Sequence, residues 1–228
     1  MSSLNPGTVR ATGIGALAIA VLYAISIPVG SLASAPGTDG SGTAVLGFFT
    51  AHRDGILAAV VLNGIAWCAL MPAVFVGLRR VLGAEGRQAM SVAVMGAAVE
   101  SALIGVVLVF AALAAYSAPG LDARAAKLLS DGYQMATVAS SWPTLTCVLG
   151  LVVAARSNST LPAIVGVLGL LVAAAHLFAA VAVARGGAFS ASGIALLAAP
   201  LFAVWMAVIG VVLLRRAARV VIPQPAAA

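Results

Sequence analysis

The chain has 228 residues, of which 63% are hydrophobic and only 8% are charged, and its mean hydropathy is +1.15. A soluble domain of this size carries about a quarter charged residues. So few charges cannot cover a surface that faces water, so we expect lipid to be the solvent for most of the chain. The composition therefore excludes an ordinary soluble protein and predicts an integral membrane protein.

The formal net charge of +6 raises the question of a nucleic-acid partner. The basic residues lie at the ends of apolar segments and form no soluble basic patch, so we expect none. The two cysteines, Cys68 and Cys147, fall inside apolar segments and are expected to be small buried hydrophobic residues. The sequence has no metal-ligand spacing, phosphate loop or G-x-S-x-G motif. It therefore predicts neither a metal nor a cofactor.

Six apolar segments are each long enough to cross a bilayer, which takes about 20 helical residues. Backbone groups in lipid must form their hydrogen bonds within the segment, so these segments are expected to be helices. The predicted fold class is all-α: a polytopic membrane protein in which one domain over 1–228 forms a bundle of six transmembrane helices. The predicted spans are about 11–30, 56–78, 89–115, 132–155, 161–184 and 192–214.

The charged residues between these segments predict the orientation. One set of loops, together with the tail 215–228, carries eight arginines and one acidic residue. The opposite loops carry four basic and four acidic residues. The positive-inside rule then predicts a multi-pass plasma-membrane protein whose N- and C-termini are both cytoplasmic.

The first apolar segment has an alternative interpretation. Arg10, the apolar run and the small residues of "SLASAPG" are similar to a signal peptide that is cleaved after Ala35. The run is longer than the roughly 7–15 apolar residues of such peptides, and Pro36 follows the candidate cleavage site. We therefore prefer an uncleaved first helix and keep the signal peptide as the alternative. In the next loop, 31–54, the stretch "SAPGTDGSGT" is expected to be flexible, and "GFFTAHRDG" is expected to return to the membrane.

Polar residues inside the predicted spans are the candidates for a functional site. A charged side chain at mid-bilayer costs about 2.5 kcal/mol or more, so such residues face the protein interior or a wet cavity. Glu100, in "MGAAVESALIG", lies near the middle of the third span. Helix geometry places residues of the second, fourth and fifth spans at similar depth. The predicted ligand-binding or proton site consists of Glu100, His176, Asn63, Ser141 and Thr144.

A second group of polar residues is expected at the outer mouth of this pocket. Asp54 and Asp131 each precede a glycine and are expected to open the second and fourth helices, because aspartate is a favourable N-cap residue. Tyr133 and Gln134 follow directly after the second of these aspartates. The sequence thus predicts an outer mouth made of Asp54, Asp131, Tyr133 and Gln134.

Three roles are open for Glu100. It can be a protonated, hydrogen-bonded structural residue, it can pair with His176 in a proton or ligand site, or it can contact a partner subunit or a lipid headgroup. Ala97, Ser101 and Gly105 are spaced four apart and predict a small-residue helix face for close packing. Glu100 lies beside that face, so we expect its side chain to point into the bundle.

The stretch 128–178 resembles the uncharacterised bacterial membrane proteins of domain-of-unknown-function family 4386. The resemblance rests on Gly132-Tyr133 near the start of the fourth span and on Leu161-Pro162, Gly166 and Leu168 at the start of the fifth. An arginine expected near the start of the third span is absent, since Arg87 already lies in the loop. The resemblance implies six helices and no particular activity.

Two classes of function fit these features. The preferred one is a non-enzymatic membrane protein: an accessory subunit, a small-ligand binder or a transporter-like bundle with a polar intramembrane pocket. The alternative is a membrane-embedded enzyme that acts on a lipid or quinone through a Glu100/His176 acid–base pair. Membrane lipids are the expected partners, together with a possible partner membrane subunit.

Overall fold

The structure is a computed structural model that describes residues 5–84, 86–157, 160–184, 186–187, 189–190 and 197–221. Within these ranges the chain consists of helices and connecting turns, and its only β-type pairing is an isolated bridge between Ala184 and Ser190. Six helical rods of the described chain are long and apolar enough to cross a membrane; a rod is either one helix or consecutive helical segments that continue one another. The predicted all-α class and the six membrane-spanning helices are thereby confirmed.

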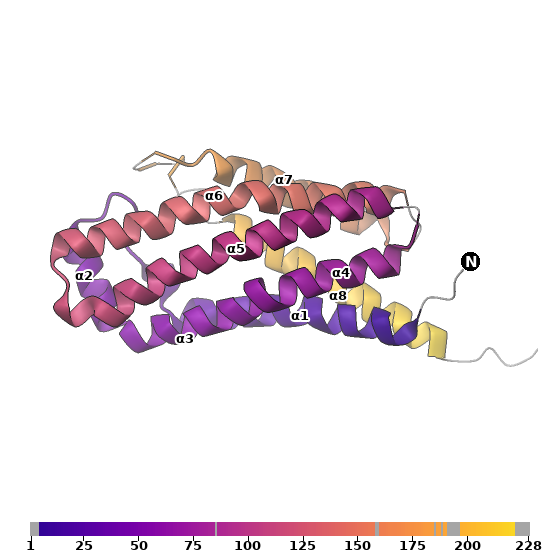
Figure 1. Cartoon of the computed structure of the whole chain (residues 1–228), viewed down its shortest axis with the longest axis horizontal. Coiled ribbons are helices and arrows are strands. Elements are labelled where there is room, and N and C mark those ends of the chain that lie inside the picture. Colours follow the sequence, from indigo (N-terminus) through magenta and orange to yellow (C-terminus); the bar gives the residue numbers. More distant parts are fainter. Residues whose placement is uncertain are drawn as a thin grey trace, which may run out of the picture.

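The second rod is made of three consecutive segments, whereas each of the other five is a single helix (Figure 1). The segments of the second rod are α3 (Arg53–Asn63), the π-helical segment η2 (Gly64–Leu70) and α4 (Met71–Leu82). The other rods are α1 (Pro6–Val29), α5 (Arg87–Ser117), α6 (Ala123–Arg156), α7 (Ala163–Ala180) and α8 (Ala198–Val221).

The fourth span begins earlier than its predicted start at 132. The Asp122 side chain caps α6 by accepting a hydrogen bond of 2.7 Å from the Ala125 amide. Asp131, which we expected to open this helix, instead lies within it and forms an ion pair with Lys127 one turn earlier. With 31 and 34 residues, α5 and α6 exceed the roughly 20 residues that cross a bilayer, so they extend beyond its apolar core.

The last two spans also differ from their predicted limits. α7 ends at Ala180, before the predicted end at 184, and the predicted start of the sixth span at 192 lies outside the described residues. α8 continues to Val221, so the first half of the predicted tail 215–228 is helical, while 222–228 lie outside the described chain.

The predicted loop 31–54 contains a helix, α2 (Gly42–Ala51), which is capped by Ser41 and overlaps the stretch expected to be flexible only at its last two residues. Its Val45 and Phe49 side chains are buried in a small apolar cluster with Ile56, Ala114, Ala115, Ala118 and Ala126. The sequence analysis predicted no helix here, because the apolar run that follows Ser41 is too short to cross a bilayer. That run buries its apolar face against the extended ends of α5 and α6.

The six rods form a closed ring in sequence order. Each rod packs against the rod that precedes it and the rod that follows it, and α8 closes the ring against α1. The start of α1 and the end of α8 lie at the same end of the bundle, called here the proximal end (Figure 1). The opposite, distal end carries α2 and corresponds to the predicted outer side. Which end faces the cytoplasm stays a prediction.

Large side chains fill the interior of the ring in its proximal half. Those that are almost completely inaccessible include Phe75, Leu78, Met90, Leu151, Met206 and Ile209, which lie in the proximal half. Around the outside, apolar residues such as Met95, Val99 and Val167 are exposed, as expected for helices that face lipid. The proximal half of the ring is therefore a packed apolar core.

Candidate functional site

Glu100 is buried inside the ring on α5, with 2% of its surface exposed. It lies thirteen residues after Arg87, which is about 20 Å along the axis from the proximal end. Its carboxyl group lies beside the hydroxyl groups of Ser140 and Thr144 on α6. The sequence placed Glu100 at this depth, and the structure adds that its neighbours come from α6.

A glycine one turn earlier explains how α5 and α6 come so close. A Cβ atom on Gly96 would lie 2.8 Å from the Pro143 carbonyl oxygen and 2.7 Å from the Cys147 amide nitrogen. Only a residue without a side chain allows the two backbones to approach this closely. The contact places the carboxyl group of Glu100 directly against α6.

The two hydroxyl groups beside Glu100 also have hydrogen-bond partners within α6. Thr144 Oγ1 donates to the Ser140 carbonyl oxygen at 3.0 Å, and Ser140 Oγ donates to the Thr137 carbonyl oxygen at 2.8 Å. Both hydroxyl groups also lie within hydrogen-bonding reach of the Glu100 carboxyl group, and a hydroxyl hydrogen can rotate toward either partner. Glu100 Oε2 is buried and has no hydrogen-bond partner among the described residues.

No cation of the described chain neutralises Glu100. The one salt bridge in the described ranges joins Lys127 to Asp131 at the distal end. The other charged residues of the described chain lie outside the helices or within about two turns of a helix end, and Arg87 on the same helix is about 20 Å away along the axis. The carboxyl group therefore stands alone in the membrane interior.

His176 is the second unpartnered polar residue of the interior. It lies on α7 with 5% of its surface exposed, and neither ring nitrogen has a hydrogen-bond partner in the described ranges. It follows Ala163 by thirteen residues, so its depth from the proximal end matches that of Glu100. The two side chains form no direct hydrogen bond, and α6 packs between their helices.

The polar group of Asn63 is occupied by local contacts. Its Nδ2 donates to the Ala59 carbonyl oxygen at 2.9 Å, and its Oδ1 accepts from Trp67 Nε1 at 3.2 Å. Trp67 is 5% exposed, and its ring lies 6.0 Å from that of Tyr23 and 5.1 Å from that of Phe202. Asn63 thus orients the indole of Trp67 inside the ring.

Trp67 belongs to the π-helical segment, whose geometry follows from Pro72. In this segment the Met71 amide donates to the Ala66 carbonyl oxygen, five residues back. The next amide in that pattern would reach the Trp67 carbonyl oxygen, but Pro72 has no N–H group. Ser101 Oγ supplies the missing donor from α5 at 2.8 Å. Segments of this kind occur frequently at functional sites.

The structure separates the predicted outer-mouth residues into two groups. Gln134 is 8% exposed, and Tyr133 is partly buried and lies near Tyr23 of α1, a helix on the other side of the ring. Asp54 is exposed in the first turn of α3, and Asp131 is exposed over 45% of its side chain. Tyr133 and Gln134 therefore lie within the ring, whereas the two aspartates lie on its distal surface.

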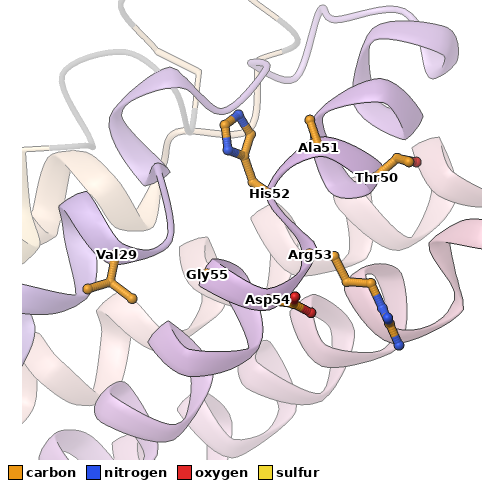
Figure 2. Close-up of a pocket in the computed structure, with 7 residues that line it drawn as sticks. All are labelled: Val29, Thr50, Ala51, His52, Arg53, Asp54 and Gly55. Carbon is orange, nitrogen blue, oxygen red and sulfur yellow. The ribbon is translucent and has the colours of Figure 1, made fainter.

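Two surface hollows at the distal end contain these aspartates. The first, of about 410 Å³, is lined by Asp54 and by neighbouring residues of the α2–α3 corner. Figure 2 shows that His52 and Arg53 project from this corner in opposite directions. The second, of about 380 Å³, is lined by Asp131, Lys127 and Arg124. Asp131 precedes Ser140 by nine residues, so the second hollow lies about 14 Å along α6 from Glu100.

Several interior residues were absent from the predicted site. Ser140 joins Thr144 beside Glu100, while the predicted Ser141 is buried and points its hydroxyl toward the Thr137 carbonyl oxygen at 3.5 Å. The spacing of four between Ser140 and Thr144 was a usable signal for one shared helix face. Tyr23 and Phe202 gave no signal, because their contacts with Trp67 join rods that are distant in sequence.

Comparisons with family models, with curated proteins and with solved structures give no match for this chain. The resemblance to domain-of-unknown-function family 4386 therefore stays a prediction. In the described ranges, no three His, Cys, Asp or Glu side chains lie together as a metal site.

Proposed function

We propose that this integral membrane protein is a non-enzymatic binder of a small membrane-soluble ligand, held inside the ring between Glu100 and His176. The observation that carries the proposal is that Glu100 Oε2 and both His176 ring nitrogens are buried without partners in the described chain. Each buried unsatisfied polar group costs about 1–3 kcal/mol. A ligand that hydrogen-bonds to one or more of these atoms would offset part of that cost, which supports a binding role over a purely structural one.

The distribution of polar residues supports entry from the distal half. Tyr133 and Gln134 lie inside the ring on the distal side of Glu100, and the proximal half is filled by apolar side chains. A ligand that enters from the predicted outer side, or laterally from lipid, would stop at the level of Glu100. This arrangement favours a binder, an accessory subunit or one state of a transporter-like bundle over an open channel.

An acid–base enzyme receives less support. Catalysis by a Glu100/His176 pair requires the two side chains within hydrogen-bond reach, directly or through one water. The direct bond is not formed, since neither His176 nitrogen is bonded to any described residue. Binding of the ligand between the two side chains is therefore the preferred function.

The proposal is tested by binding measurements on the full chain in lipid nanodiscs. The probes are 2-phenylethylamine, 2-phenylethanol, phenylacetate and decylubiquinone, which cover positive, neutral, negative and quinone chemistry. We expect at least one probe to bind, and Glu100→Gln or His176→Phe to weaken its binding about tenfold or more. Empty nanodiscs correct for partition into lipid.

Two outcomes would contradict the proposal: no probe binds above the level of empty nanodiscs, or both variants bind as the wild type does. A matched control is Thr146→Val. Thr146 is exposed on the lipid side of α6 and bonds its hydroxyl to the Trp142 carbonyl oxygen. This variant should bind normally.

A further inference from the structure

We propose that the ligand of the Glu100 site is a hydrophobic amine in its ammonium form, with the nitrogen at the carboxyl group and the apolar body against aromatic rings. This inference rests on the proposed binding function and adds the chemical class of the ligand. It is carried by the charge of the site, by its hydrogen-bonding capacity and by the aromatic side chains that share its level in the ring.

The Glu100 carboxyl group favours a ligand with a positive charge. Glu100 is the one acidic residue in the central part of any predicted span, and the described chain places no basic side chain beside it. A charge in the membrane interior is tolerated when a partner of opposite charge accompanies it. Because the described chain supplies no such partner, an anionic ligand is disfavoured and a cationic one completes the pair.

The hydrogen-bonding groups around Glu100 favour a ligand that donates hydrogen bonds. Ser140 and Thr144 can direct their protons to carbonyl oxygens of α6, and their lone pairs then accept from a ligand. The carboxylate oxygens likewise accept. An ammonium group with two or three N–H bonds matches this set of acceptors, whereas a quaternary ammonium, an ether or a ketone has no proton to donate.

The aromatic side chains supply a surface for the rest of the molecule. Trp67 contacts the rings of Tyr23 and Phe202, and Phe202 lies 6.1 Å from His176. These residues come from α1, η2, α8 and α7, which line the ring opposite α5 and α6. Tyr23, Trp67, Phe202 and His176 are called here the aromatic wall. Aromatic faces attract organic cations and pack well against apolar groups.

The carboxyl group and this aromatic wall lie at the same level. Ser101, the residue after Glu100, hydrogen-bonds the backbone carbonyl of Trp67. Cys68, the residue after Trp67, lies near Glu100, with its Sγ atom 3.4 Å from the Ser101 carbonyl oxygen. One small molecule can therefore span from the carboxyl group to the Trp67 ring.

A bare metal ion fits the same acceptors less well. In the part of the chain that the structure describes, no three His, Cys, Asp or Glu side chains converge. The hard ions Ca²⁺ and Mg²⁺ take at least six oxygen ligands or keep several waters, and aromatic rings supply neither. The combination of one carboxyl group with an aromatic wall instead selects an organic cation.

The test compares 2-phenylethylamine with 2-phenylethanol, which has nearly the same shape and no charge, by calorimetry on the full chain in nanodiscs. We expect the ammonium compound to bind about tenfold or more tightly than the alcohol. Glu100→Gln should abolish this preference. Thr144→Val should reduce it, because one acceptor is lost, and Thr146→Val should leave it unchanged.

The outcomes separate this inference from the proposed function. If 2-phenylethanol, phenylacetate or decylubiquinone binds at least as tightly as the amine and depends on Glu100, the ligand class is wrong and the binding site stands. If no probe binds, both proposals fail. If Glu100→Gln does not yield folded protein, as judged by size-exclusion chromatography, Trp67→Leu provides the second test. It should lower amine affinity more than about threefold, and an unchanged affinity would overturn the assignment of the aromatic wall.

Discussion

The Ser101 hydroxyl donates a hydrogen bond of 2.8 Å to the backbone carbonyl oxygen of Trp67 and thereby joins α5 to the π-helical segment of the second rod. The same hydroxyl lies 2.8 Å from the Ala97 carbonyl oxygen of its own helix. Pro72 removes the amide that would otherwise satisfy Trp67 in the π-helical pattern. A serine on one helix therefore compensates for a proline on its neighbour, at the level of the candidate site.

Removing this hydroxyl should destabilise the bundle. Ser101→Ala leaves the Trp67 carbonyl oxygen without its donor inside the membrane, where no water replaces it. We expect the free energy of unfolding to fall by about 1–2 kcal/mol, measured by denaturation in mild detergent. Ser91→Ala is the control on the same helix, since that exposed hydroxyl bonds only the Arg87 carbonyl oxygen. Equal effects of the two substitutions would contradict the proposed tie.

The close contact between α5 and α6 predicts a contrast between two glycines of α5. In Gly96→Ala the new methyl group would meet Pro143 and Cys147 backbone atoms at under 3 Å, so the helices must separate. We expect a loss of about 1–3 kcal/mol in unfolding free energy. At Gly105 no atom lies within 4 Å of the added Cβ, and Gly105→Ala should be neutral or stabilising, because alanine favours the helix. Thermal denaturation of both variants distinguishes the two sites.

The indole group of Trp205 forms a hydrogen bond that joins α8 to α7. Trp205 is 1% exposed, and its Nε1 donates to the Val165 carbonyl oxygen at 2.8 Å. Trp205→Phe keeps most of the apolar volume but removes the donor, so we expect a loss of about 1–3 kcal/mol. Trp142→Phe is the control, because Trp142 is 51% exposed on the outside of α6. If the two variants have the same unfolding midpoint, the Trp205 bond contributes nothing to stability.

The sequence was most informative where lipid imposes a simple constraint. A membrane span needs about 20 apolar residues, so the number of helices could be read from hydropathy alone. The ends of the helices depend on contacts outside the apolar core. The cap by Asp122 and the packing of α2 against α5 and α6 extend the fourth rod beyond the predicted boundary, and hydropathy carries no record of either.

The sequence predicted how deep the site residues lie along their helices, but not how each helix is rotated about its axis. Counting residues gave Glu100 and His176 depths of about 16 Å and about 22 Å from the predicted inner edge, because the helical rise is constant. Which neighbours each residue meets depends on how each helix is turned about its axis. The Gly96 contact with α6 and the contact between Trp67 and Phe202 fix that rotation, and both join residues far apart in sequence. A single sequence without its relatives does not record such pairings.

Replacing Glu100 by glutamine separates a structural role from a binding role. The glutamine amide has nearly the same shape, can donate to the oxygens of Ser140 and Thr144, and carries no charge that needs a partner. Residues that are kept for function often reduce stability. If Glu100 serves ligand binding, the free energy of unfolding of Glu100→Gln should therefore equal that of the wild type or exceed it by up to about 2 kcal/mol. Denaturation of the ligand-free protein in detergent measures this difference. A variant less stable than the wild type by more than about 1 kcal/mol would instead identify Glu100 as a structural residue and remove the main support for the binding site.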